Sequence, residues 1–230
     1  ISILVILYKN NLYLAISFFS VVVKEGYINK VENRINNDKL RDIVFNMFTN
    51  CVNLKLDFSK LPDKPSIIVC NYCCDRLENL PCILIPKDIV ILMRDSLIKI
   101  SKLDKLIKWA IYTKEKGSYE DTKKQILEHT KEGRYIFSYI SKYPKLGPTY
   151  IQGVRSGMFN LAKELNIPIT LMTIDYIDTN EFGMIKNQNF NIVIGDTFKV
   201  NNVNESVYRA KKFFKFMLTK FQNNKYKGII

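Results

Sequence analysis

Two short polar stretches hold the side chains most suited to chemistry, and each directly follows an apolar run. The first begins at Asn71, after the β-branched residues 67–69, and contains the carboxylate of Asp75. The second ends at Lys142, after residues 135–139, which are apolar except for Ser138. Runs of this kind predict buried strands, and in α/β proteins chemistry gathers where strands end and loops begin. The two stretches therefore predict one site at the carboxyl ends of two strands.

The sequence favours neither a cysteine nucleophile nor a metal site. Cys73 and Cys74 carry thiols in the first stretch, but a nucleophilic cysteine needs a nearby base. The one histidine, His129, falls within a predicted helix, away from both strand ends. The second Cys-x-x-Cys pair typical of zinc is missing from the cysteine cluster, which consists of Cys70, Cys73, Cys74 and Cys82. We expect no metal, and the absence of glycine-rich phosphate loops disfavours nucleotide-dependent enzymes.

Length and composition predict one folded domain with a basic surface. The 230 residues suffice for one full-sized core, and a hydrophobic fraction of 47% excludes a disordered chain. A net charge of +13 indicates an acidic partner: anionic lipid, a phosphorylated substrate or nucleic acid. A solvated lysine-rich surface, in a chain heavy in Asn, Lys and Ile, explains part of this charge equally well. Five cysteines without the spacing of a secreted framework indicate an intracellular protein.

The N-terminal residues are predicted to associate with a membrane. Residues 1–7 and 12–23 are apolar, but Lys9 lies between them, and neither run reaches the roughly twenty residues of a spanning helix. An interfacial or re-entrant hairpin fits this pattern better than a clean span, and a degenerate signal peptide fits it less well. We expect a membrane-associating segment at 1–24, an α/β domain at 25–230, and a location at the cytoplasmic face of a membrane.

Apolar periodicity predicts alternating strands and helices in the rest of the chain. Further buried strands are predicted at 89–93, 167–177 and 190–194, the last closed by Gly195 and Asp196. Amphipathic helices are predicted at 97–110, 118–133, 154–165 and 204–221, with one or two short helices between 25 and 53. This alternation indicates a single α/β domain with a mostly parallel central sheet flanked by helices.

The motifs follow one another in an order that a known family shares. They are Asn71-Tyr-Cys-Cys-Asp-Arg-Leu77, Phe137-Ser-Tyr-Ile-Ser-Lys142, Arg155-Ser-Gly-Met-Phe-Asn-Leu-Ala162, Ile167-Pro-Ile169 and Ile192-Val-Ile-Gly195. This order resembles the glycerolipid acyltransferases typified by 1-acyl-glycerol-phosphate acyltransferase, over about residues 65–221. In that family the first two motifs are Asn-His-x-x-x-x-Asp and Phe-Pro-Glu-Gly-Thr-Arg.

The resemblance implies an acyltransferase-like fold and a reaction. The reaction is transfer of a fatty acyl group from acyl-CoA to a lysophospholipid or glycerol-phosphate acceptor at a membrane. In the family the histidine is a general base that the aspartate orients, whereas here Tyr72 and Leu77 stand at those positions. The chain is therefore identified as a divergent member with degenerate catalytic motifs. Tyr72 and Asp75 are its candidate catalytic residues.

The same resemblance implies where substrate binds. The family's second motif holds the acceptor phosphate with its Glu and Arg, whose positions here are Tyr139 and Lys142. Lys114 falls near a further family arginine. The expected substrate-binding residues are Lys142, Ser141, Tyr139, Arg155 and Lys114. The expected partners are acyl-CoA as co-substrate, without other cofactor, a lysophospholipid or anionic lipid, and a membrane surface.

Two other functions are open to a chain of this kind. Because the base, its orienter and the phosphate glutamate are all replaced, the alternative is an inactive pseudo-acyltransferase that binds lipid or acts as a scaffold. A nucleic-acid-binding domain would explain the charge, but the sequence holds no recognised module for it. The apolar N-terminal segment has no use in such a domain, so no nucleic-acid partner is expected.

Overall fold

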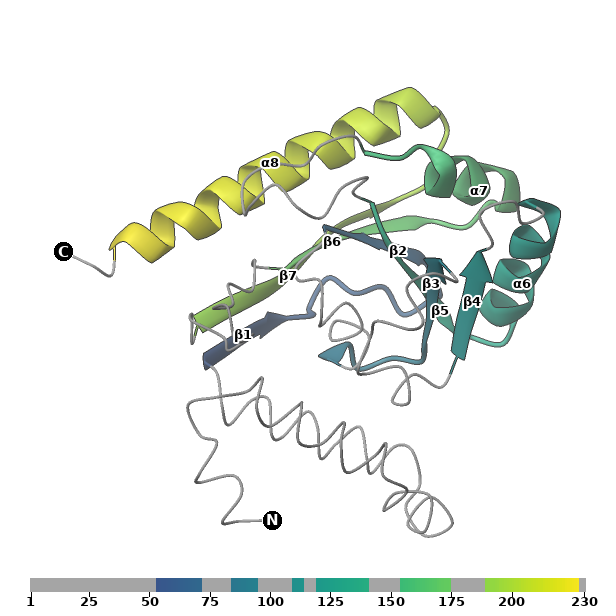
Figure 1. Ribbon diagram of the computed structural model, residues 1–230, viewed down its shortest axis with the longest axis horizontal. Helices are drawn as coiled ribbons and strands as arrows, with labels where there is room; N and C mark the ends of the chain where they lie inside the picture. The colour runs from purple at the N-terminus through teal and green to yellow at the C-terminus, as the bar shows by residue number, and fades with distance from the viewer. Residues whose placement is uncertain are drawn as a thin grey trace, which may run out of the picture.

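A central sheet of seven strands organises the part of the chain that the structure describes (Figure 1). The structure is a computed structural model, and it describes residues 53–71, 84–94, 109–113, 119–140, 154–174 and 189–227. The strands are β1 (Asn53–Asp57), β2 (Ile67–Cys70), β3 (Ile89–Arg94), β4 (Trp109–Thr113), β5 (Tyr135–Tyr139), β6 (Ile169–Ile174) and β7 (Asn189–Phe198). Their order in the sheet is β1-β7-β6-β2-β5-β3-β4. All neighbouring pairs are parallel except β6 and β7, which confirms the predicted α/β class and mostly parallel sheet.

β2 occupies the middle of the sheet because its residues are apolar on both sides. All residues of Ile67–Cys70 are 0% exposed. A strand between parallel neighbours has both faces covered, so it carries a continuous apolar run in place of an alternating one. β5 follows the same rule, with Ile136 and Phe137 fully buried. These two continuous runs are the strands that the sequence predicted most directly.

Three described helices cover one face of this sheet: α6 (Tyr119–Lys131), α7 (Gly157–Leu165) and α8 (Val203–Lys227) (Figure 1). Alternate strand residues point toward them, so Ile67 and Val69 of β2 belong to the same core cluster as the helices' apolar residues. Ile126 of α6, Phe159 of α7 and Phe214 of α8 complete that contact, and each is 0% exposed. Full burial of each such side chain contributes about 1.5–3 kcal/mol. The helices are thus held to the sheet mainly by this cluster.

Asparagine residues mark two of the helix ends. Oδ1 of Asn202 accepts hydrogen bonds from the N–H groups of Asn204 at 2.9 Å and Glu205 at 3.3 Å, which caps the start of α8. α7 ends at Asn166, whose φ of 53° is left-handed, a conformation that asparagine tolerates better than most residues. The helix predicted at 154–165 ends where α7 does, whereas the helix predicted at 204–221 continues to Lys227.

β7 is longer than the sequence predicted, because it stays paired with β6 as far as Phe198, and it also makes a close contact with α8. Gly195 and Asp196 do not close the strand, because both lie within β7, which runs to Phe198. A Cβ atom placed on Gly195 would lie 2.5 Å from the ring of Phe213, so the ring of this α8 residue rests directly on the strand backbone. Arg209 of α8 adds an ion pair to Asp196 at 2.9 Å. The glycine therefore marks a helix–strand contact inside a strand.

Other predictions are corrected or fall outside the described residues. The helix predicted at 97–110 is wrong at its end, because Ala110 lies in β4, where the β-branched and aromatic residues of Trp109–Thr113 form an edge strand. β1, the opposite edge strand, was not predicted. The membrane segment at 1–24, the boundary after it and the helices between 25 and 53 lie outside the described residues. Within the described part of the chain, no helix has the length and apolar character needed to cross a membrane.

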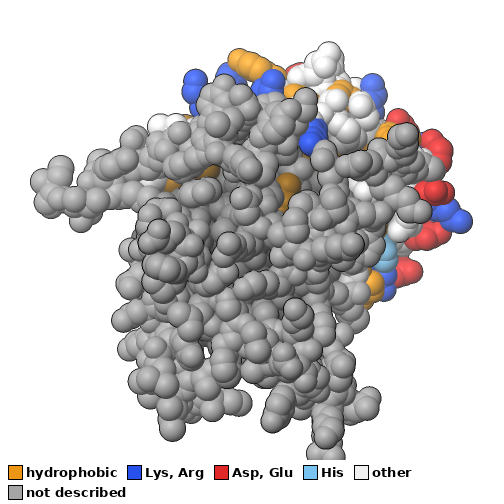
Figure 2. All heavy atoms as spheres, viewed as in Figure 1, with side chains coloured by type: hydrophobic (Ala, Val, Ile, Leu, Met, Phe, Trp, Pro, Cys, Tyr) orange, Lys and Arg blue, Asp and Glu red, His pale blue; other side chains and the backbone are white. Residues whose placement is uncertain are grey.

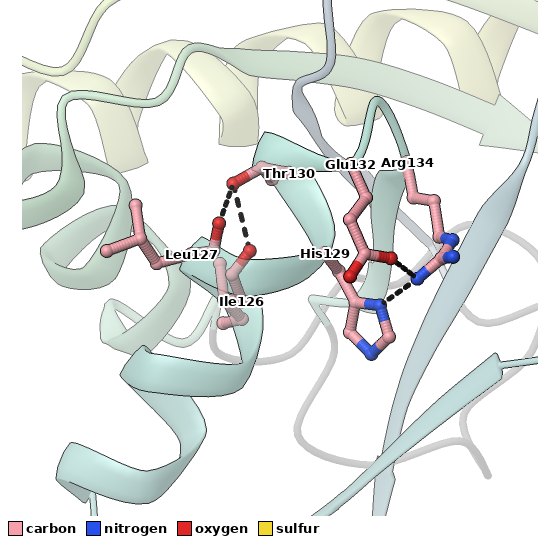
Figure 3. A network of polar contacts seen from close by, with 6 residues as sticks. All are labelled: Ile126, Leu127, His129, Thr130, Glu132 and Arg134. Atoms are coloured by element: carbon pink, nitrogen blue, oxygen red, sulfur yellow. Dashed lines mark hydrogen bonds and ion pairs between the residues drawn. The ribbon is translucent and has the colours of Figure 1, made fainter.

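The last turn of α6 holds His129 against Arg134 (Figure 3). Nη1 of Arg134 lies 2.8 Å from Nδ1 of His129, and Arg134 also forms an ion pair with Glu132. A guanidinium group can only donate, so Nδ1 accepts and the imidazole is neutral. The guanidinium carbon lies 4.1 Å from the ring centre of Trp109, a cation–π contact that joins the end of α6 to β4. His129 therefore has a structural role at the sheet edge.

This contact predicts a pH-dependent contribution of His129 to stability. Burial, with the positive charge of Arg134, lowers the pKa of His129 below its usual 6.5. The unfolded chain therefore binds a proton more readily than the folded chain, so the free energy of unfolding falls as the pH drops from about 7 toward 5. In urea titrations, the natural chain should lose more stability over this range than His129→Gln does. Equal losses in both chains would contradict the assignment.

Candidate active site

The carboxyl ends of β2 and β5 lie side by side at the centre of the sheet. The two strands pair in parallel with Cys70 opposite Tyr139. One residue further on, the N–H of Ile140 donates to the carbonyl of Cys70 at 2.9 Å. Both predicted motifs continue from this point, one after Asn71 and the other after Ile140. The structure therefore confirms that the two strand ends meet at one edge.

Two more strand ends lie at the same level. β3 pairs with β5 in a register that sets Leu92 opposite Ser138, so Arg94, the last residue of β3, falls level with Ile140. β4 pairs with β3 so that Thr113 is opposite Arg94. Neighbouring strands are about 4.8 Å apart, so the four ends from β2 to β4 span about 14 Å. That width suits the head of a substrate that carries both a reacting group and a charged group.

Asn71 fixes the end of β2 to β6. Its side chain is buried, and Nδ2 donates to the carbonyl of Ile174 at 2.8 Å. Oδ1 accepts from the N–H of Ile174 at 2.9 Å and from the hydroxyl of Thr173 at 3.0 Å. The amide thus satisfies both backbone groups of Ile174, just beyond the last paired residue of β2. Because the side chain takes over this pairing, the backbone of Asn71 leaves the strand where the first motif starts.

Tyr139 ends β5 on the face of the sheet opposite the three helices. Its ring lies 5.1 Å from that of Phe137 at an interplanar angle of 89°, an edge-to-face contact. The side chain is half-buried and lies on the same side of the sheet as Cys70. At this strand end the chain therefore presents a phenol that can exchange hydrogen bonds.

Arg155 lies at the same edge, directly before α7. Its N–H donates to the carbonyl of Ile140 at 3.2 Å, and its side chain is exposed. Backbone hydrogen bonds therefore link Cys70, Ile140 and Arg155 in turn, and the start of α7 lies beside the carboxyl ends of β2 and β5. The amino end of a helix favours negative charge, and the guanidinium of Arg155 adds to that preference. This corner of the edge suits a phosphate group.

The predicted site residues divide into two groups. Tyr139, at the end of β5, and Arg155, whose N–H donates to the carbonyl of Ile140, both lie at the sheet edge. The remaining predicted residues lie outside the described part of the chain: Tyr72, Asp75, Lys114, Ser141 and Lys142. Tyr72, Lys114 and Ser141 nevertheless directly follow the strand-end residues Asn71, Thr113 and Ile140 in the sequence.

Sequence reasoning missed three residues of this edge. Thr173 and Ile174 hold Asn71, but they lie more than a hundred positions away, and no local pattern indicates the pairing. Arg94 was also missed. The sequence held a signal for it, since it is a cation directly after the strand predicted at 89–93.

No described group of three or more histidine, cysteine, aspartate or glutamate side chains is placed to hold a metal ion. Cys70, from the cysteine cluster, is buried in β2, with its Sγ 3.8 Å from Oδ1 of Asn71.

Comparison with known proteins bears on the architecture. No protein-family model matches the sequence, and no curated protein matches it. Among solved structures, the chain is similar to the 1-acyl-sn-glycerophosphate (LPA) acyltransferase PlsC from Thermotoga maritima, with a TM-score of 0.67 and 14% sequence identity. The alignment covers 92% of this chain and 95% of that chain. The chain therefore shares the fold of that enzyme. The resemblance expected from the motifs is thereby confirmed for the architecture, and the chemistry must be argued from the site residues.

Proposed function

We propose that this protein transfers a fatty acyl group from acyl-CoA to a lysophospholipid or glycerol-phosphate acceptor at a membrane surface. One observation carries the proposal: both motifs start from adjacent strand ends, joined by the 2.9 Å hydrogen bond from Ile140 to Cys70. This juxtaposition occurs within a fold similar to PlsC over 92% of the chain. The sheet edge is therefore the place where acyl donor and acceptor would meet.

The acceptor's phosphate is proposed to bind at the cations of this edge. Arg155 is exposed beside the start of α7, and Lys142 and Lys114 follow the ends of β5 and β4 in the sequence. Lysine at the second-motif position supplies a point charge without the paired donors of an arginine, so phosphate would be held less rigidly there. Arg155 and the amino end of α7 would compensate for part of that loss.

Asp75 is proposed as the proton acceptor. The acceptor's hydroxyl oxygen attacks the thioester carbonyl carbon, a carbon–oxygen bond forms and the carbon–sulfur bond breaks. The hydroxyl proton passes to Asp75 and then to the leaving CoA thiolate. Between Asn71 and Leu77 the one carboxylate is Asp75, and an ordinary carboxylate is ionised at neutral pH whereas a phenol such as Tyr72 is not. Tyr72 would donate a hydrogen bond to the carbonyl oxygen as negative charge develops on it.

The second candidate function is lipid binding or scaffolding without turnover. The observation that favours it is the joint replacement of the family's base, orienter and phosphate glutamate by Tyr72, Leu77 and Tyr139. The two candidates share the fold and the lipid ligands, and they differ in whether labelled product forms.

A location at the cytoplasmic face of a membrane is part of the proposal. Acyl-chain substrates reside in or at the bilayer, and the apolar residues 1–24 suit an interfacial segment. The five cysteines show no secreted framework, which favours the cytoplasmic side.

Acyl transfer from labelled acyl-CoA to lysophosphatidic acid tests the proposal. Asp75→Asn should lower kcat about 100-fold, the contribution of a positioned general base, while KM changes little. The matched control is Asp63→Asn, which removes an exposed carboxylate before β2, at the opposite end of that strand. Equal rates in the natural chain and Asp75→Asn would contradict the role of Asp75. If acyl-CoA raises the melting temperature but no product forms, the second candidate is supported.

A further inference from the structure

The outward side of α8 combines exposed lysines with exposed aromatic rings, and the proposed acyl transfer uses none of them. These residues lie opposite the buried stripe of Ala210, Phe214 and Met217 that packs toward the sheet. We define the α8 outer face by its members: Tyr208, Lys211, Lys212, Lys215, Phe216 and Lys220. All six are exposed. A helix that buries one stripe and presents such a face has a surface suited to a second partner.

The charged side chains of α8 are almost all positive. The helix contains seven lysine and arginine residues and one acidic residue, Glu205. Arg209 pairs with Asp196 at 2.9 Å, whereas no lysine of the α8 outer face forms an ion pair with another described residue. α6 is different, because it holds three acidic residues, three lysines and a histidine. Figure 2 shows the contrast: blue side chains follow the upper rim, where α8 runs, and red ones gather at the right, near α6.

The aromatic rings of this face are unusually exposed for their size. Phe216 is 66% exposed and Tyr208 is 60% exposed. Lysines flank Phe216 on the helix surface, at the preceding position and four residues away on each side. Nζ of Lys212 also lies 5.1 Å from the ring centre of Tyr208. A phenylalanine ring has no hydrogen-bonding group, so it is stabilised most by an apolar layer. The lysines around it are stabilised by negative charge, so the best partner offers an apolar layer directly beneath a negatively charged surface.

A lipid bilayer with anionic headgroups offers both properties in one plane. We infer that the α8 outer face docks the protein on such a bilayer, with its lysines among the headgroups and Phe216 inserted at the acyl boundary. Nucleic acid would satisfy the lysines but offers Phe216 no apolar layer, so the bilayer is the better match. The inference goes beyond acyl transfer, because docking needs no turnover and uses a surface separate from the sheet edge.

Vesicle binding of the full chain, measured without acyl donor or acceptor, tests the charge part of the inference. Binding to phosphatidylcholine vesicles with 30% phosphatidylserine should weaken about 25-fold in Lys212→Ala/Lys215→Ala, at roughly fivefold per lysine near an anionic surface. The matched control is Lys124→Ala/Lys131→Ala, which removes the same charge from exposed positions of α6 and should change binding less than threefold. Equal weakening in both pairs would overturn the inference, because only net charge would then matter.

A fluorescence measurement tests insertion directly, even if other segments also bind the vesicles. Trp109 is the one tryptophan, so Trp109→Phe provides a silent background. In that background Phe216→Trp should give a blue-shifted emission, quenched by brominated lipid, when anionic vesicles are added. A tryptophan introduced on α6 in the same background, Lys124→Trp, should show neither the blue shift nor the quenching. An unshifted emission from Phe216→Trp on vesicle-bound protein would overturn the inference, and so would binding to duplex DNA tighter than to the vesicles.

Discussion

Replacing Asn71 by alanine should lower the free energy of unfolding by about 3 kcal/mol. The side chain is only 3% exposed and forms hydrogen bonds with both backbone groups of Ile174 and with the hydroxyl of Thr173. Alanine would leave the N–H and the carbonyl of Ile174 buried without these partners, and each such group costs about 1–3 kcal/mol. The loss should also release the end of β2, so we expect the site edge to lose its geometry together with stability.

Urea unfolding followed by circular dichroism measures this effect. The control is Asn160→Ala, an asparagine exposed on α7, which should change stability by less than about 0.5 kcal/mol because alanine suits a helix. Asn71→Asp separates hydrogen bonding from size: it retains an acceptor for the Ile174 N–H but sets an oxygen against the Ile174 carbonyl, so it too should destabilise. A loss below 1 kcal/mol in Asn71→Ala would show that β2 is held in place by other contacts.

The buried strands were predictable because each is a run of consecutive, mainly apolar residues. Ile67–Cys70 and Tyr135–Tyr139 are apolar on both faces, as central parallel strands must be, and no helical pattern competes with them. The helix α7 was equally clear, since its apolar residues recur at helical spacing. The alternation of these elements indicated the α/β class, and the resemblance of the motifs to those of a known family indicated the acyltransferase architecture.

The edge strands and the end of β7 were harder to predict for a physical reason. β4 is short, and Ala110 within it fits a helical stripe as well as a strand. Gly195 has the local signature of a strand end, yet it lies in the strand because the ring of Phe213 needs the space that a side chain would fill. The ambiguity at Ala110 is local, whereas the contact between Gly195 and Phe213 joins distant residues, so no short window of sequence contains it.

The candidate site was predictable to the level of strand ends. The sequence indicated that Asn71 and Tyr139 would lie at two strand ends, and the parallel register sets these ends side by side. The amide pairing of Asn71 with Ile174 was not predictable, because the two residues are 103 positions apart. The hydrogen bond that brings Arg155 to the same edge is likewise a product of tertiary packing.

The second large effect expected is a gain of activity. Tyr72→His together with Leu77→Asp introduces the base and orienter that the motif resemblance implies at these positions, and Tyr72 directly follows Asn71, the residue that fixes the end of β2. A histidine has an ordinary pKa near 6.5, so at neutral pH it takes up and returns a proton far more effectively than a carboxylate. General base catalysis contributes about 100- to 10,000-fold, so the double change should raise kcat by at least tenfold over the natural chain.

The most direct measurement is acyl transfer from labelled acyl-CoA to lysophosphatidic acid by the natural chain beside Tyr72→His/Leu77→Asp. We predict labelled phosphatidic acid from both chains, with the double change at least tenfold faster. Product from the double change alone would establish an acyltransferase site that has lost its chemistry, which is the second candidate function. No product from either chain, with both folded and both stabilised by acyl-CoA, would contradict the claim that this sheet edge is an acyl-transfer site.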